Sequence, residues 1–423
     1  MSTTDVLPAA TTHNDRVATA VRRSVPWPQI TTSSAILRSA RSSSEKVKVS
    51  LLTDGTDPIA RLSTTTQQDG DEVGRADARQ SGRQLPAIGL GQDGAVVDLG
   101  GQARVSTGRL PDRGEVQRLV GEAFAEVAGG SGGEVSRVYP ALARVAPDLF
   151  GVCVVGVSGA VYAVGDADHR FALMSVAKPF VLAAMIEHVG FDRVRDLVGV
   201  NATGTAFDSI AAVDASPDGR TNPMVNAGAI ATVSLAPGDS VEQRWDVVRD
   251  GLSRFAGHPL TLDEEVHDSA AATNLRNRAI AAALHARGRI VGPPQDALEL
   301  YTRQSSLSVT ARDLAVMGAT LADGGVNPLT RQRVVTAATC RLVLAVMATA
   351  GLYEASGDWL CDVGLPGKSG IGGGIVTVSP GKGGLGTFAP PLDAAGNSVK
   401  GQLVARLLSR SLGLDLLASA PAG

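Results

Sequence analysis

The chain changes character near residue 105, and this change limits where a folded core can form. Before that point Trp27 is the only aromatic residue, and Ser, Thr, Asp, Gln and Gly dominate the text. Such a segment buries too little apolar surface to offset the entropy lost on ordering. We therefore expect residues 1–104 to be a low-complexity, disordered extension and residues 105–423 to form the folded domain. A start codon assigned too far upstream would account for the extension equally well.

The apolar pattern after residue 105 predicts an α+β domain. The expected elements, in chain order, are a helix from residue 113, strands over 149–155 and 160–164, a helix over 175–188, a mainly helical region over 208–340, strands after 353 and a helix over 399–412. Apolar residues recur at helical spacing from residue 113. The two strand-like runs over 149–155 and 160–164 are close enough in sequence to form a hairpin. Strands, then helices, then strands and a terminal helix indicate a sheet domain with a helical insertion.

Composition and charge exclude several classes of partner. The net charge is −3, with an isoelectric point near 6.1, so no basic field favours nucleic acid or an anionic membrane. No apolar run reaches the roughly 18 residues that span a bilayer. The three cysteines, Cys153, Cys340 and Cys361, form no CxxC pair, and the six histidines have no metal-ligand spacing. We expect a cytoplasmic protein without a metal or cofactor.

Ser175 and Lys178 form an S-x-x-K motif at the start of an expected helix. One helical turn separates the two side chains, so the hydroxyl and the amine can meet. A serine is a poor nucleophile until a base takes its proton, and a desolvated, neutral lysine can serve as that base. A serine N-cap followed by a surface lysine would give the same motif. The motif therefore needs support from elsewhere in the chain.

That support comes from Lys368-Ser369-Gly370, which lies on a strand-like run. Penicillin-binding proteins and class A β-lactamases place a K-T/S-G strand beside the serine of their S-x-x-K motif. A penicillin-recognising hydrolase is thus one alternative, although the Ser-Asp-Asn element of that class is absent. The same stretch mimics a phosphate-binding loop, but Asp362 occupies the position of the first glycine and a strand follows.

The stretch TNPMVNAGAI at 221–230 points to a family. It resembles the signature of the serine-dependent glutaminases, which have a β-lactamase/transpeptidase-like fold. The resemblance covers roughly residues 108–423, and further matching blocks lie at 139–151, 171–179, 276–280, 324–329, 351–353, 364–370 and 390–401. It implies an antiparallel sheet flanked by helices, with an all-helical subdomain.

The resemblance also implies a role for individual residues. Ser175 would attack the side-chain carboxamide of L-glutamine, and Lys178 would receive its proton. Tyr353 would carry the proton to the leaving ammonia, and the backbone N–H groups of Ser175 and Ile371 would form the oxyanion hole. The positions that match substrate-binding residues of the family are Tyr139, Asn226, Asn277 and Tyr301.

Two positions depart from the family pattern. Met174 stands before the nucleophile where these enzymes usually have Gln, and Ala270 stands where they have a substrate-binding Glu. That Glu would pair with the α-amino group of glutamine, and its loss would cost about 1.5–3 kcal/mol. Asp268 or Glu265 could compensate through a shifted helix. Otherwise we expect weak affinity for glutamine, or a related amide as substrate.

The sequence as a whole predicts a cofactor-free glutaminase that releases L-glutamate and ammonia, assembled as a homodimer or homotetramer. Two alternatives stay open at this point. One is a catalytically weak or silent protein with a glutamine site, which Ala270 suggests. The other is a related amidohydrolase of the S-x-x-K class.

The composition of residues 1–104 gives a first prediction. Limited proteolysis of the full chain should leave a resistant core that begins near residue 105, because an unfolded segment is cut far faster than a packed one. A chain that starts at Val105 should keep full solubility and activity. If that shorter chain were insoluble or inactive while the full chain worked, residues 1–104 would belong to the functional unit.

Overall fold

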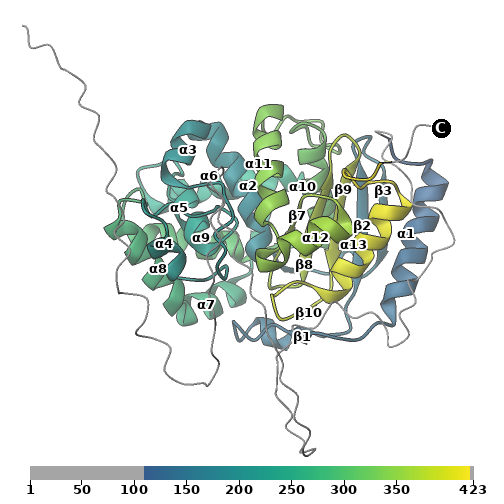
Figure 1. The fold of residues 1–423 in the computed structure, drawn as a ribbon, viewed down its shortest axis with the longest axis horizontal. Coiled ribbons are helices and arrows are strands. Elements are labelled where there is room, and N and C mark those ends of the chain that lie inside the picture. The colour runs from purple at the N-terminus through teal and green to yellow at the C-terminus, as the bar shows by residue number, and fades with distance from the viewer. Residues whose placement is uncertain (1–108, 420–423) are drawn as a thin grey trace, which may run out of the picture. The chain divides into compact units, whose positions relative to one another are not determined.

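A five-stranded antiparallel sheet is the frame of the computed structural model, which describes residues 109–419 (Figure 1). The predicted extension over 1–104 lies outside the described residues. The strands, in spatial order, are β3 (Val161–Gly165), β2 (Gly151–Gly156), β9 (Gly383–Phe388), β8 (Gly374–Ser379) and β7 (Gly367–Ser369). All four pairings are antiparallel. The predicted hairpin is confirmed as β2 and β3, with Val154 opposite Tyr162.

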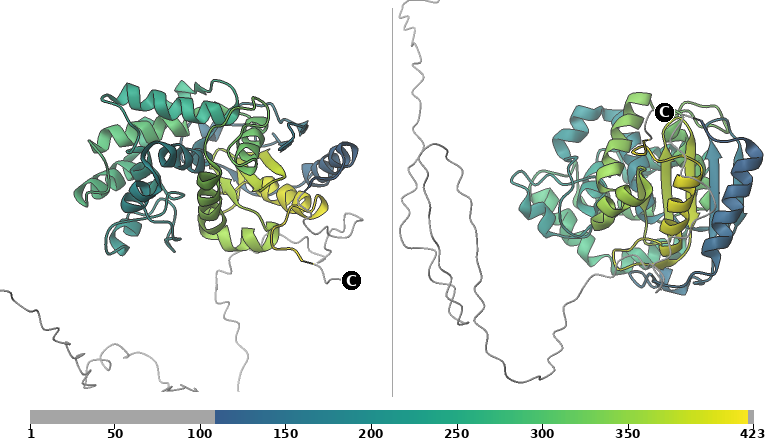
Figure 2. Two further views of the ribbon diagram at one scale, coloured as in Figure 1. Left: turned by 90° about the horizontal axis from the view of Figure 1, so that it is seen from above. Right: turned by 45° about the vertical axis from the view of Figure 1, so that its right-hand side comes forward.

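One face of the sheet is covered by the first and last helices of the described chain (Figure 2). These are α1 (Arg113–Ala128) and α13 (Val399–Ser411), with α12 (Ser356–Val363) beside α13. Both helices were predicted from sequence, and both bury an apolar stripe against the strands, as an amphipathic helix does. Helix α1 contacts α13, β2 and β3, so it is an integral part of this domain.

The opposite face is covered by α10 (Ala311–Ala322), which lies unusually close to β9. Strand β9 presents Gly384 and Gly386 to this helix, and a methyl group on either would collide with helix backbone, at the carbonyl oxygens of Ala315 and Ala311 respectively. Glycine in a strand interior often marks such a close backbone approach. A capping box between Thr310 and Asp313 fixes where α10 begins.

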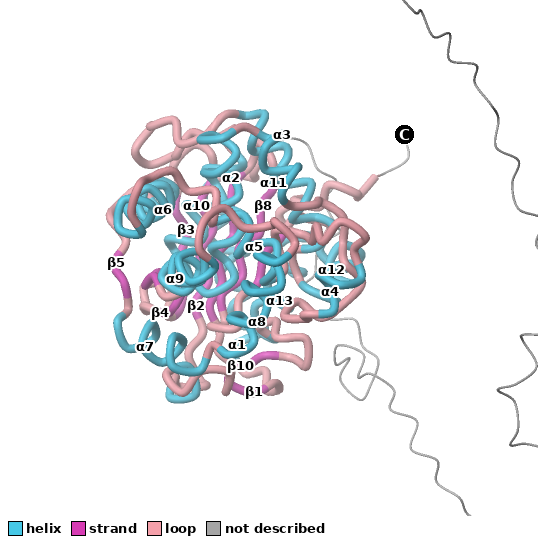
Figure 3. Tube along the Cα trace, turned by 90° about the vertical axis from the view of Figure 1, so that its left-hand side faces the viewer, coloured by secondary structure: helices cyan, strands magenta, loops and turns pink. Residues whose placement is uncertain are grey.

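The rest of the described chain forms a helical half beside the sheet (Figures 1 and 3). Its helices are α2 (Ala177–Val189), α3 (Phe191–Leu197), α4 (Ala211–Ala215), α5 (Asn226–Val233), α6 (Val241–Ala256), α7 (Glu264–Thr273), α8 (Leu275–Ala286), α9 (Pro294–Ser305) and α11 (Ala337–Ala350). Helix α2 is buried from Ala177 to Ile186 and contacts α3, α5, α6 and α11, so it is the core helix of this half.

Two small sheets and three 3-10 turns complete the described fold. They are β1 (Glu134–Val135) with β10 (Pro391–Leu392), β6 (Leu307–Val309) between β4 (Phe171–Ala172) and β5 (Thr261–Leu262), and η1 (Leu142–Arg144), η2 (Met174–Val176) and η3 (Tyr353–Ala355). The predicted α+β class, an antiparallel sheet flanked by helices with an all-helical part, is confirmed.

No single helix within residues 109–419 is long and apolar enough to cross a membrane. Two helix pairs with a sharp bend pass the length and composition test only when their members are joined: Met174–Val189 with Phe191–Leu197, and Ala337–Ala350 with Tyr353–Val363. Over the same residues no group of three or more His, Cys, Asp or Glu side chains is placed to hold a metal ion.

The close approach of α10 to β9 gives a prediction about stability. Gly386→Ala should lower the free energy of unfolding by about 1–3 kcal/mol, because the new methyl group must push α10 away from the sheet. Gly121→Ala is the matched control: it lies in α1 with open space around the Cβ position, and it should stabilise the protein by about 0.5–1 kcal/mol. Urea unfolding of both variants measures this difference. Equal effects would mean that α10 adjusts without cost.

Candidate active site

Ser175 and Lys178 meet where the small sheet runs into the core helix. Strand β4 leads into the turn η2, which carries Ser175, and α2 carries Lys178 one turn later. The Lys178 Nζ lies 2.9 Å from the Ser175 Oγ, and both side chains are buried. The helix predicted to open at Ser175 instead begins as a 3-10 turn and becomes α-helical at Ala177.

Met174 and Tyr353 both adopt left-handed backbone angles, with φ of 48° and 57°. Among the described residues, Arg331 is the only other non-glycine residue with a positive φ. Such a conformation costs of order 1–3 kcal/mol and persists only where the surroundings impose it. Met174 is held in a small apolar cluster together with Tyr139 and Ile371. The strain therefore falls directly before Ser175 and at the predicted proton carrier.

A chain of amide hydrogen bonds extends from Lys178 into the helical half. The Oδ1 of Asn226 accepts from Lys178 Nζ at 2.8 Å and from the Tyr301 hydroxyl at 2.9 Å. The Nδ2 of Asn226 donates to Asn277 Oδ1 at 3.0 Å, and Asn277 Nδ2 donates to Asn274 Oδ1 at 2.5 Å. These side chains come from α2, α5, α8, α9 and the break before α8. The structure thus brings together three of the four predicted substrate-binding residues with the S-x-x-K pair.

Tyr353 approaches from the sheet side, together with a second buried lysine. Its hydroxyl donates to the carbonyl oxygen of Ser369 at 3.2 Å, and Lys368 Nζ donates to the same oxygen at 2.7 Å. The Lys368 amine also lies 4.1 Å from the centroid of the Tyr353 ring. Phe207 packs against that ring, with centroids 4.3 Å apart. Tyr353 is therefore held on several sides by β7 and by the loop before α4.

The turn between β7 and β8 lies against the backbone of Ser175. A methyl group on Gly370 would stand 3.2 Å from the Ser175 backbone nitrogen, and Ile371 follows directly in this turn. Within residues 109–419 neither the Ser175 N–H nor the Ile371 N–H donates to a protein acceptor. Two backbone donors in this region are thus available to a bound molecule.

The burial of the site shifts its proton affinities. Loss of water lowers the pKa of Lys178 to about 7, and the Asp208 carboxylate acts in the opposite direction. Burial raises the pKa of Tyr353 to about 12 and raises that of Tyr301 well above its usual range. Burial, with the nearby Lys178 charge, lowers the pKa of Lys368 well below its usual range. Near neutral pH the site therefore combines a lysine poised to lose its proton with phenols that keep theirs.

The helix that carries Ala270 brings neither Asp268 nor Glu265 into the site. Ala270 is 3% exposed and lies on α7, which packs on α9. The Asp268 and Glu265 side chains are 81% and 70% exposed, and they pair with His267 and Arg144 at the surface. The shifted helix that would bring either carboxylate into the site is absent from the structure.

Sequence reasoning missed three residues of this site. Asn274 supports Asn277 from the preceding turn, and a local signal for it existed, since the two are three residues apart. Lys368 was noticed as part of a K-S-G strand but was given no role. Asp208 carried no signal at all, because only the fold brings it beside Arg276, with which it forms an ion pair.

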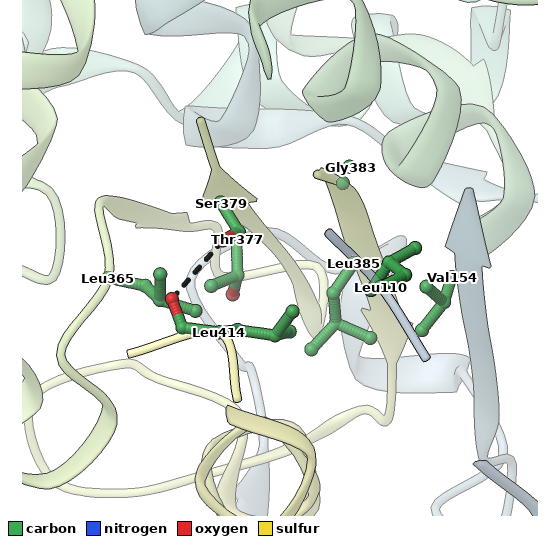
Figure 4. A pocket seen from close by; sticks show the side chains of 9 residues that line it. Leu110, Val154, Leu365, Thr377, Ser379, Gly383, Leu385 and Leu414 are labelled. Carbon is green, nitrogen blue, oxygen red and sulfur yellow. Dashed lines mark hydrogen bonds between the residues drawn. The ribbon is translucent and has the colours of Figure 1, made fainter. Parts of the chain in front are cut away.

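A small apolar cavity on the sheet is separate from this site (Figure 4). It is lined by Leu110, Val154, Leu365, Thr377, Ser379, Gly383, Gly384, Leu385 and Leu414. The one hydrogen bond among the side chains drawn runs from the Ser379 hydroxyl to the Leu414 carbonyl oxygen, at 3.2 Å. None of the lining residues is titratable, so this cavity is a packing gap with no chemistry of its own.

Comparison with known proteins agrees with the geometry. The sequence profile of the glutaminase family matches residues 133–417. Glutaminase 2 of Yersinia pestis is 62% identical over 317 residues, which cover 75% of this chain and 93% of that protein. Among solved structures, the probable glutaminase ybaS is 42% identical with a TM-score of 0.72, covering 73% of this chain and all of that one. The protein Mglu in its glutamate form is 36% identical with a TM-score of 0.69, covering 73% and 71%.

Proposed function

This chain belongs to the glutaminase family and is an enzyme that hydrolyses glutamine, and we propose that it works through an acyl-enzyme on Ser175. The observation that carries the proposal is the 2.9 Å contact between Ser175 Oγ and the buried Lys178 Nζ. We assign the activity to residues 105–423. The family match begins at residue 133, but α1 packs on the sheet ahead of it. The oligomeric state and the cytoplasmic location stay predictions of the sequence.

In the first step, neutral Lys178 takes the hydroxyl proton of Ser175 while Oγ attacks the side-chain carboxamide carbon of glutamine. A neutral amine has two N–H bonds and one lone pair. One N–H donates to Asn226 Oδ1, which leaves the second N–H and the lone pair. When the amine is neutral, the lone pair can accept the Ser175 hydroxyl proton across the 2.9 Å contact. The oxyanion that forms is held by the N–H groups of Ser175 and Ile371, neither of which donates to a protein acceptor within residues 109–419.

In the second step, the carbon–nitrogen bond breaks and ammonia leaves. Tyr353 gives its phenolic proton to the leaving nitrogen and takes the proton that Lys178 holds. Its pKa of about 12 keeps the phenol protonated in the free enzyme, so Tyr353 can donate a proton to the leaving nitrogen. Water then attacks the ester carbon and returns a proton to Ser175 along the same groups. The products are L-glutamate, ammonia and free enzyme.

Substrate recognition falls to the amide and phenol groups that line the site. Asn226 and Asn277 each offer both a donor and an acceptor, so they can pair with an amide or a carboxylate without adding charge. Tyr301 is already linked to Asn226, and Tyr139 packs in the cluster that contains Met174. Mglu, a related protein, has been solved in a glutamate form, and a glutamate molecule matches the product proposed here.

The proposal predicts a defined pH profile. The value of kcat/KM should rise with pH to a plateau, with a midpoint near pH 7, because protonated Lys178 cannot accept the Ser175 proton. Asp208 is the carboxylate that raises this pKa, while Ser175, Asn226 and Tyr301 surround the amine without charge. Steady-state rates between pH 5 and 9 on glutamine measure the midpoint. A profile that is flat between pH 5 and 9, or one that still rises at pH 9 without a plateau, would contradict a Lys178 base with a pKa near 7.

The proposal also predicts that catalysis and binding can be separated. Ser175→Ala should lower ammonia release from glutamine by at least ~10³-fold while calorimetric binding of glutamine stays measurable. Lys178→Ala should be nearly as damaging, and the double variant no worse, since the two groups act as one unit. Ser158→Ala, in the exposed β2–β3 turn, is the matched control and should change neither. Substantial ammonia release by Ser175→Ala would remove Ser175 from the mechanism.

A further inference from the structure

The catalytic groups of this enzyme are joined by hydrogen bonds without a carboxylate among them. Lysines, asparagines, tyrosines and backbone groups make these hydrogen bonds around Ser175 within residues 109–419. Glutamine carries an α-ammonium group at neutral pH. A buried ammonium without an anionic or hydrogen-bonding partner is costly, and Ala270 has only a methyl group to offer. An anion from another element would supply that partner.

Asp208 lies in the loop before α4, and its chain neighbour Phe207 contacts two residues of the site. The carbonyl oxygen of its neighbour Phe207 accepts from the Asn226 backbone N–H at 2.8 Å. The Phe207 ring packs on Tyr353 with centroids 4.3 Å apart. The residue directly before Asp208 thus contacts both a predicted substrate-binding residue and the predicted proton carrier.

Arg276 holds the Asp208 carboxylate from the other direction. It pairs with Oδ2 of Asp208 and is the chain neighbour of Asn277. Within the described residues no group donates to the second oxygen, Oδ1. The Asp208 side chain is 28% exposed, so it is neither sealed in the core nor free in solvent. One oxygen is fixed by an arginine and the other is available to a ligand.

The reach of the Asp208 charge agrees with this placement. Burial is the main influence on the pKa of Tyr139, Lys178 and Tyr301, and the Asp208 charge raises the pKa of each, which for Lys178 opposes the effect of burial. Glu354 and Asp393 act on Tyr353 instead.

Three other carboxylates, Asp393, Glu265 and Asp268, already have partners. Asp393 is engaged by Gln402 and by backbone N–H groups of its own turn. Glu265 and Asp268 stand at the surface with partners of their own. Among the carboxylates of residues 109–419 that these contacts place near the site, Asp208 has the position and the open oxygen that an ammonium ligand requires.

We propose that Asp208 binds the α-ammonium group of the substrate, in the charge-pairing role that Ala270 cannot fill, and so selects amides of α-amino acids over amides without an amino group. This inference rests on the proposed glutaminase function and deepens it. Asp208 is a binding residue here, and it takes no part in the proton transfers at Ser175. Its loss should therefore be felt in substrate affinity far more than in turnover.

The test compares two ligands that differ only in the amino group. L-Glutamine and its deaminated analogue, glutaramic acid, are titrated calorimetrically into the full chain carrying Ser175→Ala, with and without Asp208→Asn. Asp208→Asn should weaken glutamine binding by about tenfold or more, which is the effect of ~1.4 kcal/mol. Binding of glutaramic acid should change by less than about twofold, because it lacks the ammonium group.

Controls separate this role from a structural one. Asp214 lies in the adjacent helix α4 and pairs with Arg287. Asp214→Asn removes this carboxylate and should leave both affinities unchanged. Steady-state kinetics of Asp208→Asn with Ser175 intact should show a raised KM for glutamine with kcat within about threefold. Equal weakening of both ligands, or unchanged glutamine binding, would overturn the proposal.

The outcomes also distinguish this proposal from the mechanism. If the unaltered enzyme released no ammonia from glutamine, the acyl-enzyme mechanism would fail. If the preference for glutamine over glutaramic acid still depended on Asp208, the proposed ammonium-binding role of Asp208 would stand. Conversely, normal turnover with no loss of glutamine affinity in Asp208→Asn would keep the mechanism and remove the site.

Discussion

Burial of the Lys178 amine beside Ser175, with neutral hydrogen-bond partners, is the constraint on which the rest of the site depends. A protonated amine in this position would bear a large desolvation penalty. Burial lowers the pKa of Lys178 to about 7. The amine donates to the Asn226 amide oxygen, which also accepts from the Tyr301 hydroxyl. A carboxylate in direct contact would hold the proton on the amine and remove the base. In the proposed mechanism, the asparagine network is thus the chemical condition for a reactive serine.

This burial is possible because α2 is enclosed by other elements from Ala177 to Ile186. Helices α5, α6 and α11 pack around it, and the 3-10 turn before it lies against the turn after β7. The sheet is in turn compressed against α10 by the glycines of β9. Strain collects where these two halves meet, at Met174 and Tyr353. Both residues are immobilised by the packing around them, which is how rigid halves can store strain at a reaction centre.

The Asp208 carboxylate is partly exposed at the edge of the site, where solvent screens its charge. Asp208 is close enough to influence Lys178 and two tyrosines, yet it pairs with Arg276 and stays partly exposed. In the proposed site, this anion pairs with the ammonium group of the substrate, while Lys178 keeps neutral hydrogen-bond partners. A glutamate at position 270 would solve the same problem from α7, and here that helix carries an alanine. Two different elements can therefore supply one charge.

The sequence by itself determined the class of fold, the S-x-x-K pair and the order of the blocks around it. Helical and strand periodicity is local, and the contact between Ser175 and Lys178 needs only one helical turn. It could not determine that α2 starts with a 3-10 turn, that Asp268 and Glu265 face solvent, or that Lys368 lies under the Tyr353 ring. Only the tertiary structure placed Asp208 beside Arg276, 68 residues later. Proton affinity and charge pairing depend on desolvation and on contacts between distant segments, and packing alone decides both.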